Sequence, residues 1–356
     1  MSLALHVLVP GDLATRTGGF IYDRRMVEGL RGRSWAVHVH DVGAGFPAPS
    51  AAVRAHAAQA IDALPDNALV VADGLAFGVL PDVVEAHARR LRWVALVHHP
   101  LALESGIDAD RQRALFDSEQ RALALARGVI VTSPSTARAL AAYAVPASRI
   151  VVVEPGTDAA PLATGSGSAA LALLCVATLT PRKGHALLLE ALAALGDRAW
   201  TLHCAGSTTM DPACAAAVAD AARRHGLQGR VVLHGELEGA ALEALYAGAD
   251  AFVLPSFHEG YGMALAEALA RGLPVISTLA GAIPDTVPAE AGALVPPGDM
   301  PALRAALQRL LDDAPWRAQA ADGARVARER LPTWDDGAER LAGALLQIAD
   351  VAAGRA

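Results

Sequence analysis

Short apolar segments alternate along the chain with longer segments in which apolar residues recur at helical spacing. In the first part of the chain, the apolar segments are LALHVLVP, WAVHVHDV, ALVVAD, LRWVALVHH, GVIVTS and RIVVVEPG. Alternation of this kind is typical of βαβ units, in which parallel strands are joined by helices. Residues 1–160 are therefore predicted to form one doubly wound sheet of about six strands.

A second alternating series begins after residues 161–169, where Pro, Gly and Ser interrupt both periodicities, as expected of a flexible connection. Its strands are LALLCVATLT, WTLHCAG, RVVLHG, AFVLPS and LPVIST, and its helices are expected from about His185, Pro212, Ala240 and Tyr261. The fold class predicted is α/β, with two Rossmann-like, doubly wound parallel-sheet domains facing a cleft.

The second domain is expected over 170–332, and the last segment, 333–356, is expected to be a helix that packs back on the N-terminal domain. Its first turn has a capping threonine followed by two aspartates, and its apolar residues lie on one face. In a parallel doubly wound sheet, ligands bind outside the carboxyl ends of the strands. Functional residues are therefore expected in the loops that lead from strand to helix.

Composition narrows the class of protein. The 356 residues are 53% hydrophobic and 19% charged, which excludes a disordered chain, and the net charge of −7 provides no field that would attract nucleic acid. The three cysteines form no CxxC pair and are expected to be reduced core thiols. No apolar run reaches the roughly 20 residues that span a bilayer. We expect a cytoplasmic protein that binds no nucleic acid and meets a membrane at most peripherally.

The densest candidate chemistry lies in EGYGMALAE, which contains Glu259 and Glu267. Eight helical residues rise about 12 Å, whereas two acids that flank one glycosidic bond lie about 5 to 9.5 Å apart. Between them, the N–H groups of Gly260, Tyr261 and Gly262 would stand at a helix N-terminus, where anions bind. The layout predicts an extended ligand with a diphosphate at its centre.

Three other loops carry residues that suit such a ligand. Arg182 and Lys183 follow a strand in PRKG and would supply positive charge, although a solvated loop has the same residue types. Gly18 and Gly19 open a helix after the first strand, which is also common in a plain turn. His98 ends a later strand, where an imidazole could reach the ligand or simply meet the loop.

Taken together, these segments resemble the family 4 retaining glycosyltransferases of the GT-B fold over nearly the whole chain. EGYGMALAE is similar to that family's Glu-x7-Glu motif. Further similar segments are the GG loop, PRKG, HGEL, LYAGADAFVLPS, GAIPDTV and ALVPPGD.

The resemblance implies roles for individual residues. Glu259 would hold hydroxyls of the donor sugar, Glu267 would bind the ribose diol, and Lys183 with Arg182 would neutralise the diphosphate. His98, rather than the adjacent His99, would be the histidine near the reacting sugar. The resemblance also implies that the base of the donor meets backbone near Leu237. The other residues that it implies for donor binding are Gly18, Gly19, Gly260, Tyr261, Gly262 and Met263.

The resemblance also implies the reaction, namely transfer of a sugar from a UDP- or GDP-linked donor to an acceptor hydroxyl with retention of the anomeric configuration. No cofactor or metal is expected, because the chain has neither an Asp-x-Asp motif of the metal-dependent glycosyltransferase type nor HExxH. Thr178 stands where the family commonly has an arginine, so a catalytically degenerate nucleotide-sugar-binding protein stays open as an alternative. An epimerase or phosphorylase of the same fold is another.

The acceptor is left open among a lipid, a glycan and a small molecule. Residues 16–33 hold five arginines against Asp23 and Glu28, and this excess suits either anionic lipid or, as the favoured interpretation, an ordinary solvated helix. An NAD-dependent dehydrogenase is a remote alternative, because no strand is followed by GxGxxG.

Overall fold

The computed structural model describes residues 3–350, and the chain folds into two compact units. Unit 1 comprises the residues up to Gly156 together with those from Pro332 onward, and unit 2 comprises Thr157–Leu331. The predicted domains end at 160 and 332, so the structure divides the chain close to both positions. No helix in the described range is both long and apolar enough to cross a lipid bilayer.

Unit 1 is built on a six-stranded parallel sheet in the order β2-β1-β3-β4-β5-β6. The strands are β1 (Ala4–Val9), β2 (Ala36–Asp41), β3 (Leu69–Asp73), β4 (Arg92–Val97), β5 (Gly128–Val131) and β6 (Ile150–Val152). The alternating α/β pattern predicted this sheet, and the prediction is confirmed. Since β1, β3 and β4 are neighbours, the loops after them begin side by side.

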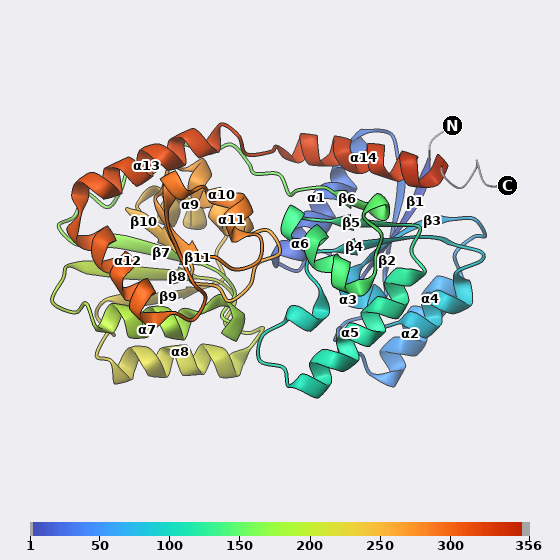
Figure 1. Ribbon diagram of the computed structural model, residues 1–356, viewed down its shortest axis with the longest axis horizontal. Coiled ribbons are helices and arrows are strands. Elements are labelled where there is room, and N and C mark those ends of the chain that lie inside the picture. Colours follow the sequence, from blue (N-terminus) through green and yellow to red (C-terminus); the bar gives the residue numbers. More distant parts are fainter. Residues whose placement is uncertain (1–2, 351–356) are drawn as a thin grey trace. The chain divides into compact units, whose positions relative to one another are not determined.

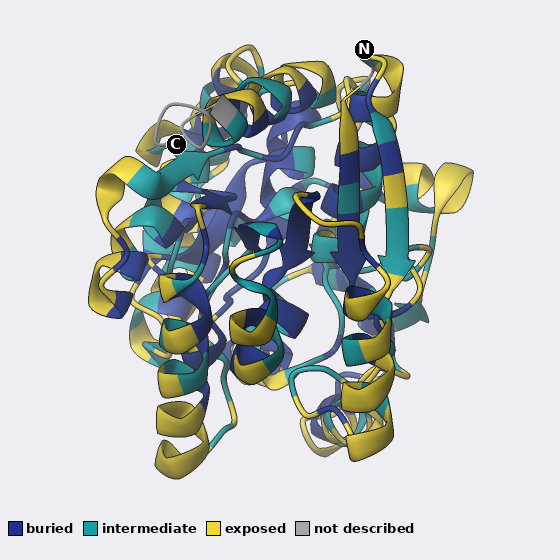
Figure 2. Cartoon of the chain, turned by 90° about the vertical axis from the view of Figure 1, so that its right-hand side faces the viewer, coloured by how far each residue is buried: buried dark blue, intermediate teal, exposed yellow. Residues whose placement is uncertain are grey.

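Helices cover both faces of this sheet (Figure 1). They are α1 (Gly18–Gly32), α2 (Ala51–Asp62), α3 (Gly74–Phe77), α4 (Pro81–His87), α5 (Ala109–Ala124), α6 (Pro134–Ala139) and α14 (Trp334–Asp350), with single turns η1 (Leu101–Leu103), η2 (Leu140–Tyr143) and η3 (Ala147–Arg149). Side chains of β1 alternate between two cores: Leu5, Val7 and Val9 pack with α1 and α14, and Leu8 packs with α2 and α4. Figure 2 shows the resulting pattern, with buried strands and exposed outer helix faces.

The final helix, α14, belongs to unit 1 although the chain reaches it from unit 2. Thr333 and Asp336 cap it reciprocally: the Thr333 hydroxyl donates to the Asp336 carboxylate at 2.6 Å, and the Asp336 N–H donates to the Thr333 hydroxyl at 3.1 Å. The helix packs on α1 so closely that a Cβ at Gly29 would lie 2.4 Å from the Ala338 side chain.

Unit 2 contains a second six-stranded parallel sheet, in the order β12-β11-β10-β7-β8-β9. Its strands are β7 (Leu171–Val176), β8 (Trp200–Ala205), β9 (Val231–Gly235), β10 (Ala251–Val253), β11 (Val275–Thr278) and β12 (Gly292–Val295). The sequence pattern predicted only the first five. β12 has four residues, of which only the last is buried, so it produces almost no apolar pattern.

The helices of unit 2 surround one continuous apolar core that includes Trp200, Tyr246 and Phe252. They are α7 (His185–Ala193), α8 (Pro212–Arg224), α9 (Gly239–Ala247), α10 (Met263–Ala270), α11 (Ile283–Thr286), α12 (Met300–Asp312) and α13 (Ala314–Arg328), with single turns η4 (Pro181–Lys183) and η5 (Ala289–Ala291). The last two long helices were not assigned from the sequence. Helix α10 begins at Met263, two residues later than expected, because Gly262 has a left-handed conformation (φ 92°).

The segment 161–169, predicted as a flexible connection, is fixed to unit 2 instead. The N–H of Ala163 donates to the carbonyl of Arg271, and the N–H of Thr164 donates to that of Ala247, each at 2.9 Å. The Ser166 hydroxyl donates to the Asp250 carboxylate at 2.7 Å. Small polar residues were interpreted as a sign of flexibility, but here their side chains and backbone form specific hydrogen bonds.

Candidate functional site

Two loops of unit 2 meet because the strands before them are neighbours. β7 and β10 pair in parallel, with Leu173 opposite Ala251, so their carboxyl ends lie at the same edge of the sheet. Lys183 lies in the loop after β7, and Glu259 lies in the loop after β10. The N–H of Phe257 donates to the carbonyl of Arg182 at 2.7 Å, which ties the loops together through their backbones.

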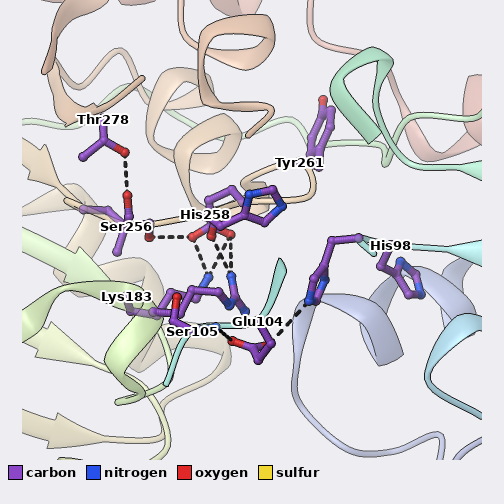
Figure 3. Close-up of polar contacts among 12 residues, drawn as sticks. His98, Glu104, Ser105, Lys183, Ser256, His258, Tyr261 and Thr278 are labelled. Atoms are coloured by element: carbon purple, nitrogen blue, oxygen red, sulfur yellow. Dashed lines mark hydrogen bonds and ion pairs between the residues drawn. The ribbon is translucent and has the colours of Figure 1, made fainter. Parts of the chain in front are cut away.

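A buried charge cluster forms where these loops touch. The Lys183 ammonium lies 2.7 Å and 2.9 Å from the two carboxylate oxygens of Glu259. The Arg182 guanidinium lies 3.5 Å from the same carboxylate and donates to the carbonyl of His258 at 2.8 Å. The Ser256 hydroxyl donates to Glu259 Oε1 at 2.6 Å (Figure 3). The structure thus brings together three residues that the sequence predicted, and adds Ser256.

Burial and charge act in opposite directions on this cluster. Burial alone would raise the pKa of Glu259, but the charges of Lys183 and Arg182 outweigh it and hold that pKa below the usual carboxyl value. Burial lowers the pKa of Lys183, and Glu259 opposes that shift. Two cations, those of Lys183 and Arg182, lie beside one carboxylate, and a pair of such donors suits an anionic ligand.

Two glycines let the loops adopt this geometry. Gly184 has a left-handed conformation (φ 72°), and a Cβ there would lie 2.2 Å from the carbonyl oxygen of Pro255. Gly262, also left-handed, turns the chain from the Glu259 loop into α10. A side chain at Gly184 would separate the two loops, so the glycine of PRKG positions Lys183 against Glu259.

Glu267 occupies the second acidic position, within α10. The hydroxyl of Tyr246 donates to its carboxylate at 2.8 Å, and Arg271 donates to its carbonyl at 2.9 Å while lying 4.2 Å from the Tyr246 ring centre. Burial raises the pKa of Glu267, and the Tyr246 hydrogen bond opposes this shift. Tyr246 and Arg271 were not predicted from the sequence, because a tyrosine in α9 and an arginine directly after α10 carry no motif.

The remaining predicted residues of unit 2 lie along the same loops. Gly260 is half-buried, and Tyr261 is buried with its carbonyl accepting from the Thr286 hydroxyl at 2.7 Å. Met263 is half-buried at the first position of α10. Leu237 is half-buried in the loop between β9 and α9, next to the carboxyl end of a strand.

Unit 1 brings its predicted residues together separately. Gly18 and Gly19 are the first residues of α1, and His98 directly follows β4. A Cβ at Gly19 would lie 3.3 Å from Cδ2 of His98, so the glycine lets the imidazole lie against α1. His99 is instead 3.4 Å from the Glu104 carboxylate.

Two aspartates that were not predicted as site residues hold His98. Its Nε2 lies 3.2 Å from Asp23 on α1 and 3.3 Å from Asp73 at the end of β3. The sequence does carry a signal for both: Asp23 falls on the stripe of buried positions Met26 and Val27 in α1, and Asp73 closes a fully buried strand. An acid on an apolar face usually has a specific partner.

Burial and charge also act against each other in this second cluster. Burial raises the pKa of Asp23 to about 7, with His98 opposing the shift and the charge of Asp73 adding to it. Burial would lower the pKa of His98, but the two aspartates outweigh it and raise that pKa to about 10. His98 is therefore an imidazolium at neutral pH.

The arginines of residues 16–33 largely serve the packing of unit 1. Arg24 donates to the carbonyl of Leu13 at 3.2 Å and Arg31 to that of Val37 at 3.0 Å. Arg33 pairs with Asp335 on α14 at 2.7 Å. These three arginines, of the five in the segment, therefore have partners within unit 1, and a role in lipid binding stays untested.

Within the described residues, two groups of side chains could hold a metal ion. One is the cluster of Asp23, Asp73 and His98. The other joins Cys175, His185 and Cys204 in the buried core of unit 2, where the Cys175 sulfur lies 3.5 Å from His185 Nε2. A hydrogen bond explains the short distances in each group equally well. It is an N–H···O bond between His98 and Asp23 and an S–H···N bond between Cys175 and His185.

Comparison with known families follows the division into units. Residues 170–313 match the family described as Glycosyl transferases group 1, and residues 16–160 match the one described as Glycosyltransferase Family 4. The chain belongs to the family 4 glycosyltransferases. The loops of Lys183 and Glu259 both lie in the part of this glycosyltransferase that matches Glycosyl transferases group 1.

Relatives and solved structures agree with this assignment. The chain is 30% identical over 277 residues to D-inositol 3-phosphate glycosyltransferase of Salinispora tropica, which is 68% of this chain but only 57% of that relative's length. A sucrose-phosphate synthase structure from Thermosynechococcus elongatus superposes with a TM-score of 0.82 at 21% identity, covering 98% of this chain and 100% of the other. Anabaena HepE in complex with UDP-glucose gives 0.73 at 18%, covering 99% and 100%. The fold is GT-B.

Proposed function

We propose that this glycosyltransferase moves a sugar from a nucleoside diphosphate sugar to an acceptor hydroxyl with retention at the anomeric carbon and without a metal ion. The observation that carries the proposal is the cluster of Lys183, Arg182 and Glu259 beside the loop that leads into α10. The ammonium and guanidinium donors of the cluster and the helix N-terminus all favour a diphosphate.

Lys183 and Arg182 are proposed to stabilise the charge that develops on the leaving diphosphate. Both guanidinium and ammonium are largely buried, with exposed side-chain fractions of 17% and 16%, so water screens them little. Because Glu259 already fixes their positions, little reorganisation is needed when the bond to the sugar breaks. In a metal-dependent transferase a divalent cation would take this part.

The two acidic residues are proposed to hold the outer parts of the donor. Glu259 would accept hydrogen bonds from hydroxyls of the sugar through carboxylate lone pairs that Lys183 and Ser256 do not use. Glu267 would accept hydrogen bonds from the ribose hydroxyls, and the Tyr246 hydroxyl would orient its carboxylate. Backbone near Leu237 would meet the base. A UDP-linked donor is the first to test, because the similar HepE structure is a complex with UDP-glucose.

Unit 1 is proposed to supply His98 to the reacting sugar and the Gly18 and Gly19 backbone to the phosphates and sugar. No carboxylate in either cluster is free to attack the anomeric carbon, since Glu259 is buried in ion pairs and the aspartates hold His98. Retention would then follow from attack on the face that the diphosphate leaves, with a phosphate oxygen taking the acceptor proton. The acceptor stays open among lipids, glycans and small molecules.

A panel of UDP- and GDP-sugars, scored first by thermal stabilisation, tests the proposal. A ligand at one hundred times its dissociation constant adds about 2.7 kcal/mol to the free energy of unfolding, so the true donor should raise the melting temperature clearly. With that donor, NMR of the product should show the donor's anomeric configuration, in the presence of EDTA as well. Binding without transfer to any acceptor would favour a degenerate binding protein, and release of an altered free sugar would favour an epimerase.

A further inference from the structure

The acids that surround His98 come from two separate elements and both approach the same nitrogen. Asp23 projects from α1 and Asp73 ends β3, and their exposed fractions are 2% and 4%. Their oxygens lie 3.2 Å and 3.3 Å from Nε2, so a proton on that nitrogen lies between two acceptors. The imidazole is therefore oriented with Nε2 toward the interior of unit 1.

Packing fixes the ring as well as its hydrogen bond. Gly19 leaves room for it on α1, and the Tyr22 ring meets it edge-on with centroids 5.3 Å apart. The Thr132 hydroxyl donates to the backbone carbonyl of His98 at 3.1 Å. The His98 side chain is 18% exposed, and its ring contacts both aspartates through Nε2.

The titratable groups in contact with the ring come from α1 and β3. α1 contributes Asp23 and Tyr22, whose hydroxyl donates to the Val153 carbonyl at 3.0 Å, and β3 contributes Asp73. The side chains that reach its backbone from the segment after β5 are the neutral Thr132 and Thr136. Two acids thus face one imidazole, and Asp23 Oδ2 is buried with no hydrogen-bond partner in the structure.

We propose that Asp23 and Asp73 are positioning residues that keep His98 protonated on both nitrogens, with Nε2–H held by the acids and Nδ1–H offered to the substrate. His98 then serves the transfer as a hydrogen-bond donor and a fixed positive charge, and it cannot accept the acceptor's proton. This inference rests on the proposed function for its catalytic meaning, but the protonation of His98 is a property of the free protein.

The free protein provides the first test, which requires no variant and no activity. Histidine labelled with 15N distinguishes an imidazolium from either neutral tautomer, and each of the 12 histidines can be followed with pH. Assignment comes from the spectrum that loses one signal in His98→Gln. We expect His98 to keep both protons to pH 9, and titration with a midpoint near 6.5 would overturn the proposal.

Substitution of the aspartates provides the second test. In Asp73→Asn and in Asp23→Asn, we expect the midpoint for His98 to fall by about 2 pH units, as removal of a nearby carboxylate does. With the donor found above, kcat should become pH-dependent, losing about 10-fold between pH 7 and 9, whereas KM for the donor should change less than 3-fold. A merely structural pair would change the melting temperature and leave the pH profile flat.

Glu104→Gln is the matched control, because it removes the carboxylate beside the neighbouring His99 and leaves the partners of His98 in place. Its His98 titration and pH profile should equal those of the original chain, and equal behaviour of Asp73→Asn and Glu104→Gln would overturn the proposal. An equimolar metal ion bound to Asp23, Asp73 and His98, measured by elemental analysis, would overturn it too. If no donor supports transfer, the titration still decides the protonation of His98, so the two failures are distinguishable.

Discussion

The two units carry buried charge clusters of opposite composition. In unit 2, Lys183 and Arg182 meet one carboxylate, that of Glu259. In unit 1, one imidazole meets two carboxylates, those of Asp23 and Asp73. Both clusters lie after neighbouring parallel strands, so the same topology places them. What differs is which sign is more numerous: cations outnumber the carboxylate in the unit 2 cluster, and carboxylates outnumber the imidazole in the unit 1 cluster.

This difference teaches how each cluster can be completed. We propose that the cations of unit 2 also receive an anion from outside, the diphosphate of the donor. The surplus negative charge of unit 1 is removed by a proton, since burial and Asp73 raise the pKa of Asp23 to about 7. The first cluster is therefore suited to binding a ligand, and the second is suited to holding a side chain in one protonation state.

Removal of the lysine should have the largest effect. In Lys183→Met we expect kcat/KM for the donor to fall about 1,000-fold, because a preorganised positive charge on the leaving group is lost. The free energy of unfolding should also fall by about 3 kcal/mol, because the buried Glu259 loses its closest cation and keeps only Arg182 at 3.5 Å and the Ser256 hydroxyl. Urea unfolding and initial rates measure the two effects.

The double variant Lys183→Met/Glu259→Gln separates these two losses. It removes both charges, so stability should largely return while activity does not. If activity returned together with stability, the lysine would be structural, and the comparison between the clusters would fail.

Loss of the imidazole should rank next. We expect His98→Gln to lower kcat about 100-fold, with KM for the donor nearly unchanged, since a neutral amide keeps a hydrogen bond but has no positive charge. His99→Gln is the matched control from the adjacent position, and it should retain near-full activity. Equal losses in the two variants would contradict the assignment of His98.

The contributions of the two clusters to the free energy of unfolding should change with pH in opposite directions. Glu259 has a lowered pKa, so its contribution to stability is present above the usual carboxyl value of 4.5 and is lost as pH falls below it. The raised pKa of Asp23 has the opposite consequence, because stability is lost as pH rises from 3.8 through about 7. Urea unfolding at a series of pH values measures how the free energy of unfolding changes with pH, which is about 1.4 kcal/mol per pH unit for one proton. This slope should be smaller in Glu259→Gln at low pH and smaller in Asp23→Asn near pH 5 to 7.

Removal of the hydroxyl beside Glu267 should have a smaller effect. In Tyr246→Phe we expect KM for the donor to rise about 10-fold at nearly constant kcat, because Glu267 loses the group that orients it toward the ribose. An assay with free nucleoside diphosphate as inhibitor checks the same affinity. An unchanged inhibition constant would remove Glu267 from the proposed site.

The smallest effect is expected far from both clusters, at the cap of α14. Thr333→Ala should lower the free energy of unfolding by about 1 kcal/mol and leave kcat and KM unchanged. A change in activity would mean that unit 1 depends on its final helix for more than stability.

Much of the fold was predictable because buried strands and amphipathic helices have different periods. The pattern predicted both sheets, and it failed for β12, whose short half-buried GALV has neither period. It also failed for the segment 161–169, where Ser166 and Thr164 look like linker residues until Asp250 and the Ala247 carbonyl are seen to bind them. Hydrogen bonds between distant positions leave no periodic signal.

The candidate site likewise contains residues that the sequence predicted and residues that it did not. Glu259, Lys183 and His98 were predictable because each lies in a loop after a strand, within a recognisable motif. Asp23, Asp73, Ser256 and Tyr246 were not, since their roles depend on which strands and helices are neighbours. The position of Asp23 on a buried stripe of α1 shows that an acid among apolar positions is a signal that can be used earlier.

Binding of free nucleoside diphosphate tests the central claim, that the Lys183 ammonium receives the diphosphate of the donor. Calorimetric titration of UDP and of GDP should show one of them binding to the original chain. The same ligand should bind at least 100-fold more weakly to the folded Lys183→Met/Glu259→Gln variant. Equal affinity in the two proteins would contradict the account.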